Sequence, residues 1–344
     1  MIAGLGVLVI GAGEMGGMHA RRWRDAGATI VGIYDPATVR AQEMADTFRS
    51  QAVASVEAGL ELPGVDVVSV CTPTFLHARY TVAALDAGKH VLCEKPAALD
   101  LREAFAMKEA QERSGKLLRV GFMRRFDPAW DRILQFGNSI GRPILAQATL
   151  AAGVRPKLLM HDAAANGGPI IDMCCHIFDQ WAQLFGSQPS AVRAYGYTFS
   201  QDKPEVAAIE RKALDSAHIT LIYPNGGVGQ VQVSWGLPRG IEATERHTYM
   251  GPDGLITVEW PGEVKLHGGE GTTEWHSGKI DPWEKEIRAF AGEIAGRDPG
   301  PLADIDDGIA ALRTSLAVLD SVRGDCEVCP ADVYPSELDV APLR

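Results

Sequence analysis

Short apolar runs rich in β-branched residues alternate with helical stretches up to about residue 120. Each run has the length of a strand, and the stretches between runs carry apolar residues at helical spacing, which is the pattern of successive β-α-β units. We therefore expect a doubly wound parallel sheet over residues 1–122. The predicted strands are residues 5–10, 30–34, 65–71, 90–93 and 117–122, and the predicted helices lie near 15–26, 37–48, 75–88 and 100–114.

The pattern changes in the rest of the chain. From about residue 144, longer segments alternate apolar and polar residues, which is typical of half-buried antiparallel strands, and turn pairs such as Asn225-Gly226 and Asp253-Gly254 separate neighbouring segments. Residues 123–344 therefore predict an α+β domain, whose C-terminal helices are able to pack back on the first domain. The predicted strands are 144–151, 191–197, 217–223, 227–234, 244–251 and 255–259, and the predicted helices are 169–185, 282–296 and 304–322.

Composition and charge exclude several classes of protein. The chain has 344 residues, 46% hydrophobic and 22% charged, which is near the usual globular mixture and disfavours disorder or a disulfide scaffold. A net charge of −11 without any basic run disfavours nucleic acid and anionic membranes as partners. No apolar run approaches the roughly 18 residues of a membrane span, and the N-terminus lacks a signal-peptide pattern, so we expect a cytoplasmic protein.

Six cysteines in a chain of this length fit reduced core thiols better than a disulfide framework. Cys326 and Cys329 form a CxxC pair, but a zinc site needs a second pair of ligands, and none lies nearby at suitable spacing. We therefore expect no metal.

The most informative motif is the segment GAGEMG at residues 11–16, which directly follows a predicted buried strand and opens a predicted helix. In a dinucleotide-binding turn, Gly11 permits the tight turn, Gly13 lets the backbone approach a pyrophosphate, and Gly16 lets helix and strand pack closely. The next predicted strand ends at Asp35, 19 residues beyond Gly16, where an acidic residue accepts hydrogen bonds from the adenosine ribose. The pattern indicates a Rossmann domain.

Asp35 favours NAD over NADP, because a carboxylate repels a 2′-phosphate, although Arg40 lies close in sequence. The structural alternative for the glycines alone is an ordinary tight turn between strand and helix. The strand, the helix and Asp35 together favour the cofactor interpretation. The predicted cofactor site also includes Glu14 and Met15, inside the glycine motif.

Four further segments carry a family resemblance: CTPTFLH at residues 71–77, GKHVLCEKP at 88–96, GFMRRFDP at 121–128 and GGPIIDMCCHIFD at 167–179. With the glycine motif, they resemble the Gfo/Idh/MocA oxidoreductases, the group that includes inositol dehydrogenases and glucose-fructose oxidoreductase. The resemblance covers most of the chain. It implies a second domain with an open, mostly antiparallel sheet, and an active site between that sheet and the nicotinamide end of the first domain. It also implies a homodimer or homotetramer assembled through the sheet face.

The resemblance implies particular site residues as well. The family's lysine falls on Lys95, whose bond to Pro96 is implied to be cis, and its aspartate and histidine fall on Asp172 and His176. The segment HIFD at residues 176–179 replaces the inositol-type HEID or HDLD, so inositol itself is in doubt as the substrate. A second departure is Cys174-Cys175, where a small residue or glycine is frequent. Cofactor contacts are implied around Thr72, Pro73, Thr74, His77, Glu94 and Lys95.

Alcohol oxidation explains why these residue types would be needed. A base must take the hydroxyl proton while hydride leaves carbon, and imidazole, with an unperturbed pKa of about 6.5, suits that role at His176. Asp172 lies at i−4 from it and Asp179 at i+3, so the predicted helix would carry one polar stripe. An ammonium at Lys95 would stabilise developing alkoxide charge. Taken singly, a surface lysine, a satisfied buried histidine and a helix N-terminal aspartate are the structural alternatives.

Second-rank candidates complete the predicted site. Arg124 would contact substrate or cofactor, with a structural ion pair as the alternative, and His161 would line the substrate pocket, with simple exposure as the alternative. Arg124, Arg155 and Lys157 together would hold one carboxylate, which keeps sugar acids among the candidate substrates.

The sequence therefore predicts an NAD-dependent oxidoreductase that oxidises a ring hydroxyl of a sugar, sugar derivative or cyclic polyol, or reduces the matching ketone. One alternative is a glycoside-cleaving enzyme of the same superfamily, which retains its NAD and accumulates no NADH. Another is a non-catalytic NAD-binding sensor, because a fold does not fix a function. The presence of Lys95, Asp172 and His176 together argues against a silent protein.

Overall fold

The computed structural model describes residues 4–260, 262–278 and 280–334, which form two compact units. One unit comprises residues 4–126 with Asp281–Ile309, and the other comprises Asp127–Ile280 with Ala310–Tyr334. The C-terminal segment is thus divided between them. Its first helix, α9 (Pro282–Ile294), belongs to the first unit, and α10 (Ile305–Gly324) contributes its first turn there and the remainder to the second unit.

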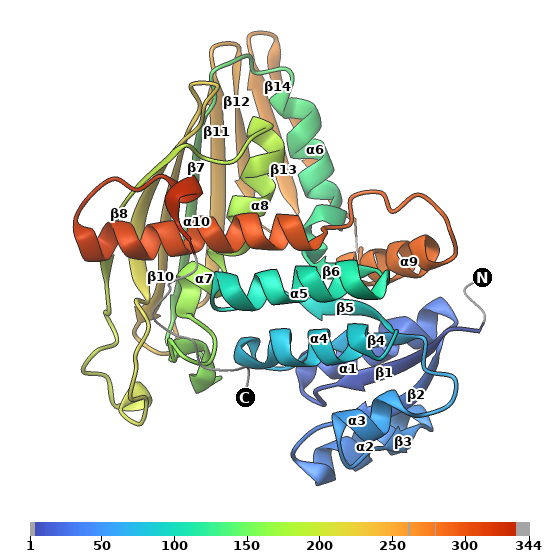
Figure 1. Ribbon diagram of the computed structural model, residues 1–344. Helices are drawn as coiled ribbons and strands as arrows, with labels where there is room; N and C mark the ends of the chain where they lie inside the picture. The colour runs from blue at the N-terminus through green and yellow to red at the C-terminus, as the bar shows by residue number, and fades with distance from the viewer. Residues whose placement is uncertain (1–3, 261, 279, 335–344) are drawn as a thin grey trace. The chain divides into compact units, whose positions relative to one another are not determined.

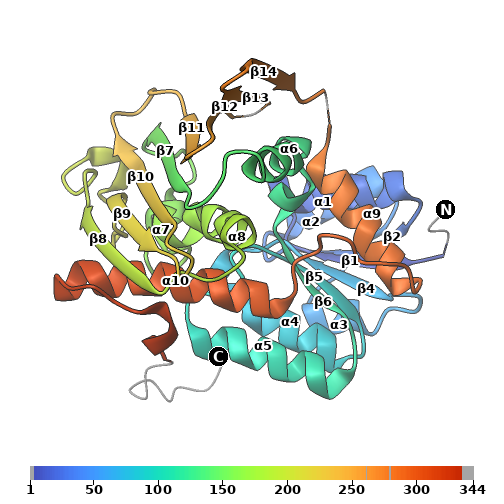
Figure 2. The same ribbon diagram turned by 90° about the horizontal axis from the view of Figure 1, so that it is seen from above.

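The first unit contains a six-stranded parallel sheet in the order β3-β2-β1-β4-β5-β6. The view in Figure 2 shows α1, α2 and α9 on one side of this sheet and α3, α4 and α5 on the other. This confirms the doubly wound domain. The strands are β1 (Gly6–Ile10), β2 (Thr29–Tyr34), β3 (Gln51–Ala52), β4 (Val67–Val70), β5 (His90–Glu94) and β6 (Leu118–Gly121). The helices are α1 (Glu14–Ala26), α2 (Thr38–Phe48), α3 (Val56–Leu60), α4 (His77–Asp86) and α5 (Leu101–Ser114), with short 3₁₀ turns η1 (Thr74–Leu76) and η2 (Met123–Phe126).

Local sequence explains where these helices begin and end. Asp100 caps α5 by accepting a hydrogen bond from the Glu103 amide, and Gly115 ends that helix in the left-handed conformation. Asp281 caps α9 in the same way. The helix then packs on α1, where the rings of Phe290 and Trp23 meet edge to face at 6.3 Å.

The second unit contains an eight-stranded sheet in the order β14-β13-β12-β11-β7-β10-β9-β8. All neighbours are antiparallel except β7 and β10, which are parallel. The expected mostly antiparallel sheet is therefore confirmed, and Figure 1 shows its long strands side by side. The sequence pattern missed the last hairpin. The strands are β7 (Leu145–Gly153), β8 (Ala191–Tyr197), β9 (Ser216–Ile222), β10 (Val228–Leu237), β11 (Thr244–Gly251), β12 (Gly254–Glu259), β13 (Glu263–Gly268) and β14 (Gly271–His276).

Helices α6 (Pro128–Gly137), α7 (Gly168–Asp172) and α8 (Cys174–Phe185) pack within this unit, together with the 3₁₀ turns η3 (Leu158–His161) and η4 (Pro204–Val206). The prediction of a single helix over residues 169–185 was wrong. The helix breaks at Met173, where the His176 amide donates to the Met173 carbonyl oxygen three residues earlier. The Cys175 thiol donates to the carbonyl oxygen of Asp172. Asp172 thus ends one helix, and His176 lies in the first turn of the next.

Among the parts of the chain that the structure describes, there is no helix with both the length and the apolar character needed to span a membrane.

Candidate active site

The glycine turn after β1 has the geometry that the motif predicts. Gly11 adopts a φ of +103°, and a Cβ added there would lie 2.5 Å from the Cys71 carbonyl oxygen, so no other residue fits without movement. A Cβ on Gly16 would lie 1.7 Å from the carbonyl oxygen of Gly11, so α1 and β1 approach as closely as the backbone permits. Gly13 has no atom within 4 Å of such a Cβ. The turn is therefore tight on one side and open at Gly13, and a dinucleotide pyrophosphate would fit there against the start of α1.

Asp35 is fixed beside this turn at the end of β2. Its Oδ2 accepts a hydrogen bond from the Ala12 amide at 2.9 Å, and its Oδ1 accepts one from the Ala37 amide at 2.8 Å. The Arg40 guanidinium, which is more than half exposed, lies 3.7 Å from Oδ1. The carboxylate is therefore joined to the glycine turn itself, which is the arrangement that a ribose-binding acid requires.

The loops after β4 and β5 lie next to the glycine turn, because β1 pairs with β4 and β4 with β5 in one parallel register. The loop after β5 carries Glu94, Lys95 and Pro96, and the Lys95–Pro96 bond is cis, as the resemblance implied. Loops at the carboxyl ends of neighbouring parallel strands form the usual ligand crevice of this fold. Lys95 is partly exposed there, whereas Glu94 is buried.

His77 joins the two loops. Its Nδ1 lies 2.7 Å from the Pro96 carbonyl oxygen, and its Nε2 lies 2.9 Å from the Thr72 carbonyl oxygen. Carbonyl oxygens only accept, so both ring nitrogens carry hydrogens and the buried ring is an imidazolium. Burial opposes this charge, but Cys93 and the two carbonyls outweigh burial and raise the pKa of His77 to about 9. Both ring nitrogens of His77 thus donate hydrogen bonds to backbone carbonyl oxygens.

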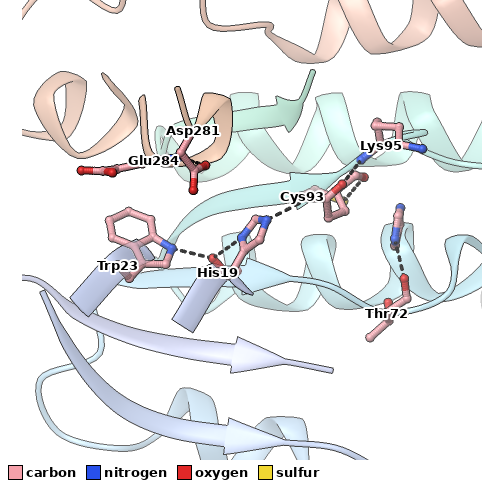
Figure 3. A network of polar contacts seen from close by, with 10 residues as sticks. His19, Trp23, Thr72, Cys93, Lys95, Asp281 and Glu284 are labelled. Carbon is pink, nitrogen blue, oxygen red and sulfur yellow. Dashed lines mark hydrogen bonds and ion pairs between the residues drawn. The ribbon is translucent and has the colours of Figure 1, made fainter. Parts of the chain in front are cut away.

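Glu94 is the centre of a buried polar network that the sequence did not indicate. Figure 3 shows His19, Trp23 and Lys95 of this network. Its Oε1 lies 2.8 Å from Nε2 of His19 on α1, whose Nδ1 lies 3.3 Å from the Ser69 hydroxyl, and the Trp23 indole donates to that hydroxyl at 2.7 Å. The backbone amide of Lys95 donates to the other carboxylate oxygen at 3.3 Å. Burial favours the neutral acid, but the hydrogen bond and charge of His19 and the charge of Lys95 lower the pKa of Glu94.

A second buried carboxyl, Glu286 on α9, has the opposite character. Neither of its oxygens has a hydrogen-bond partner among the described residues. Burial, followed by the negative charge of Glu94, raises its pKa well above the ordinary value, and the charge of Arg125 opposes this only in part. The two buried carboxyls are thus shifted in opposite directions, the pKa of Glu94 downward and the pKa of Glu286 upward.

Asp172, His176 and Asp179 are all buried in the second unit. Asp172 is the last residue of α7, and His176 and Asp179 lie on α8. The Asp179 carboxylate accepts a weak hydrogen bond from Gln183 at 3.3 Å. Arg124 is buried in η2 of the first unit.

His161 is the last residue of η3, which follows β7. Its side chain is buried, so the alternative of a simply exposed histidine does not hold. Its Nε2 accepts a hydrogen bond from the Arg155 amide at 2.9 Å, so Nδ1 carries the hydrogen of the neutral ring. Nδ1 has no partner among the described residues. Burial lowers the pKa of His161. The negative charge of Asp215 opposes this shift, and the positive charge of Arg155 adds to it. The Trp235 ring lies edge-on to His161 at 6.4 Å and beneath the Arg155 guanidinium at 5.7 Å.

The sequence did not single out His19, Glu286 or Trp235. His19 and Trp23 are spaced i,i+4 on the buried face of α1, so a polar residue within an apolar helical stripe was the available signal. Glu286 likewise lies in the apolar stripe of α9, beside Ile287 and Phe290. Trp235 offered no signal beyond its place in an alternating strand.

Two parts of the chain match families of known proteins. Residues 5–122 match a family model described as an oxidoreductase family with an NAD-binding Rossmann fold, and residues 136–257 match the GFO/IDH/MocA C-terminal domain. The chain is 31% identical to UDP-N-acetylglucosamine 3-dehydrogenase of Acidithiobacillus ferrooxidans, over 90% of this chain and 94% of that protein. It is 30% identical to inositol 2-dehydrogenase of Acidothermus cellulolyticus, over 94% and 95% of the two chains. A solved structure of the Acidithiobacillus enzyme superposes with a TM-score of 0.79 at 29% identity, covering 94% of this chain and 99% of that one.

Proposed function

The chain belongs to the Gfo/Idh/MocA family of oxidoreductases, and we propose that it is a dehydrogenase that oxidises a secondary ring hydroxyl of a sugar, sugar derivative or cyclic polyol, or reduces the matching ketone. One observation carries this proposal. The turn of Gly11 to Gly16, anchored to Asp35, lies at the carboxyl end of β1, and the loop of Lys95, joined to the β4 loop by His77, lies at the carboxyl end of β5. Only β4 separates these two strands in the parallel sheet. A cofactor cradle and a cationic side chain therefore share one edge of the sheet.

We assign the cofactor as NAD in preference to NADP. Both oxygens of Asp35 accept backbone hydrogen bonds, so the carboxylate is fixed where the adenosine ribose would bind, and a 2′-phosphate would meet its charge. Arg40 is too exposed to neutralise that charge fully. Once bound, the nicotinamide supplies the hydride acceptor.

We assign proton transfer to His176 and charge stabilisation to Lys95. The imidazole takes the hydroxyl proton during oxidation and returns it during reduction, and the ammonium stabilises the negative charge that develops on the substrate oxygen. Asp172, which ends the helix before His176, orients a neighbouring substrate hydroxyl by accepting its hydrogen. The glycines 11, 13 and 16, Glu14, Met15, Thr72 and Pro73 surround the cofactor.

We assign part of substrate recognition to His161, with Arg124 as a further contact. The Nδ1 hydrogen of His161 lacks an acceptor among the described residues, and a sugar hydroxyl or carboxylate oxygen would supply one. Arg155 lies over the same Trp235 ring, so a substrate carboxylate there would gain a charged partner. This arrangement keeps sugar acids among the candidate substrates.

We further propose a cytoplasmic homodimer or homotetramer. All six cysteines are free, which fits a reducing compartment. Leu145 and Met250 are cross-strand neighbours on one face of the second sheet, and each is nearly half exposed. Ile222 lies on the same face across Val228, so this apolar patch supports assembly through the sheet.

The assignment of Lys95 is tested by Lys95→Ala, with Lys95→Arg as the matched variant that keeps a charge. We expect NAD affinity to change little and turnover of the alanine variant to fall about 10²- to 10⁴-fold, which is the usual contribution of a positioned acid–base or charged group. NAD binding is measured by titration calorimetry and turnover by NADH absorbance. Unchanged turnover in Lys95→Ala would remove Lys95 from the mechanism.

A further inference from the structure

The buried histidine of α1 is out of place in an apolar helix face. His19 is fully buried, and the residues that share its face of α1 include Ala20 and Trp23. Burying a ring with two polar nitrogens is unfavourable unless both are hydrogen-bonded, and both ring nitrogens of His19 are. An apolar side chain would be sufficient for packing at this position. The two hydrogen bonds of His19 therefore indicate a role in holding its polar neighbours, Ser69 and Glu94.

The hydrogen bond from His19 fixes Glu94 in one orientation. Glu94 is ionised and can only accept, so Nε2 of His19 carries a hydrogen and donates it at 2.8 Å. On the other side of the ring, the Ser69 hydroxyl, which the Trp23 indole also contacts, limits rotation of the imidazole. The chain of contacts from β4 through α1 to β5 is therefore continuous and buried.

Glu94 in turn acts on Lys95 in two ways. Its Oε2 accepts the Lys95 backbone amide, which fixes the main chain from which that side chain extends. Its negative charge also lies close enough to interact with the Lys95 ammonium. Three other ionisable groups among the described residues interact with Glu94: the Cys71 thiol after β4, His77 from α4 and Glu286 from α9. Burial raises the pKa of both Cys71 and Glu286, which disfavours an anion at either. Glu94 is thus the anion of this cluster that adjoins Lys95.

We propose that His19 is a positioning residue for Lys95: by donating to Glu94, it fixes that carboxylate in the orientation from which it accepts the Lys95 amide and interacts with the Lys95 ammonium. The proposal rests on the proposed function only in the role given to Lys95. The contacts of His19 with Glu94, and of Glu94 with Lys95, are independent of substrate. A purely structural role for His19 would alter stability without altering Lys95.

The test measures Lys95 directly, in the full-length protein. Trace labelling with acetic anhydride at a series of pH values, read by peptide mass spectrometry, gives the pH at which each lysine becomes reactive, with Lys285 as internal reference. The variants are His19→Met, which removes the donor at similar volume, and His19→Gln, which keeps a nitrogen donor of similar reach. Glu94→Gln removes the charge and tests the same link if His19→Met fails to fold. The control is His90→Gln, at the opposite end of β5.

We expect the reactive midpoint of Lys95 to fall by about 1 pH unit in Glu94→Gln, because an ammonium loses a neighbouring anion. In His19→Met the midpoint should fall by less, because the Glu94 carboxylate remains but loses the donor that fixes its orientation. His19→Gln should stay near the wild type, and so should His90→Gln. In the same variants, kcat for alcohol oxidation should fall about 10- to 100-fold with His19→Met, with little change in KM for NAD.

Two results would overturn the proposal. One is an unchanged Lys95 midpoint in folded His19→Met or Glu94→Gln. The other is a shift of equal size in His19→Met and His19→Gln, which would mean that the ring acts through packing. If the wild type forms no NADH with any substrate, the proposed function fails, yet the labelling still decides whether His19 positions Lys95.

Discussion

The imidazolium of His77 makes the stability of the protein depend on pH above neutrality. The perturbation is a rise in pH from 7 to 10, compared between the wild type and His77→Gln, whose side chain does not titrate. In the folded protein, two backbone carbonyls hold both ring hydrogens and the pKa is about 9, against an ordinary value of 6.5. Because the folded pKa is raised, the folded state binds the proton more tightly than the unfolded chain does.

The magnitude follows from that difference. At about 1.4 kcal/mol per pKa unit, the shift stabilises the folded state by about 3 kcal/mol below pH 6.5. About 2.5 kcal/mol of this remains at pH 7, and nearly all is lost as the pH rises through 9 to 10. Loss of the proton would also leave one of the Pro96 and Thr72 carbonyls without its donor, so the β4 and β5 loops should separate first.

The assay is urea unfolding at pH 7 and pH 10 for both proteins. Groups that do not interact with His77 titrate alike in the two proteins and cancel, so the informative quantity is the difference in unfolding free energy between wild type and variant. We expect that difference to shrink by about 2.5 kcal/mol from pH 7 to pH 10. A difference that stays constant or grows would show that the ring of His77 is not a buried cation.

Three further outcomes are expected. Asp35→Ala should weaken binding of NAD more than binding of NADP in calorimetric titrations, and equal losses would refute the ribose assignment. Gly16→Ala should abolish NAD binding and lower the melting temperature, because its Cβ would overlap the Gly11 carbonyl, and a normal melting temperature would contradict that geometry. Glu286→Met should raise the urea midpoint by an amount equivalent to about 1–3 kcal/mol, because it removes an unpartnered buried carboxyl. The gain should be larger at pH 8 than at pH 5, since the unfolded chain releases the Glu286 proton above about pH 4.5; an equal gain at both would mean that Glu286 is ionised in the folded protein.

The cofactor half of the site was predictable because each of its constraints is local. Gly11 and Gly16 are required by backbone contacts within one β-α unit, and Asp35 follows at the end of the next strand. Each constraint therefore fixes a residue type at a fixed spacing along the chain, and such a pattern can be recognised in the sequence.

The second layer of the site was not predictable, because it depends on contacts between distant segments. His19 and Glu94 are 75 positions apart, and Glu286 approaches them from a helix near the other end of the chain. In the sequence, each is one polar residue in an apolar stripe, which is equally typical of a helix edge. Only the parallel register of β4 and β5 beside α1 brings them together.

Two local errors have local causes. The break at Met173 comes from a three-residue turn closed by the His176 amide, which helical periodicity does not reveal. The hairpin of β13 and β14 carries mostly polar, half-exposed residues, so its alternation is weak.

The most direct test is the absorbance of NADH when the purified protein and NAD are mixed with a panel of inositols, aldoses, glycosides and sugar acids. A dehydrogenase with the assigned residues forms NADH steadily with at least one member of the panel, and Lys95→Ala does not. No NADH with any member, accompanied by release of aglycone from a glycoside, would contradict net oxidation and establish the glycoside-cleaving alternative. No NADH and no product at all would leave an NAD-binding protein without the proposed chemistry.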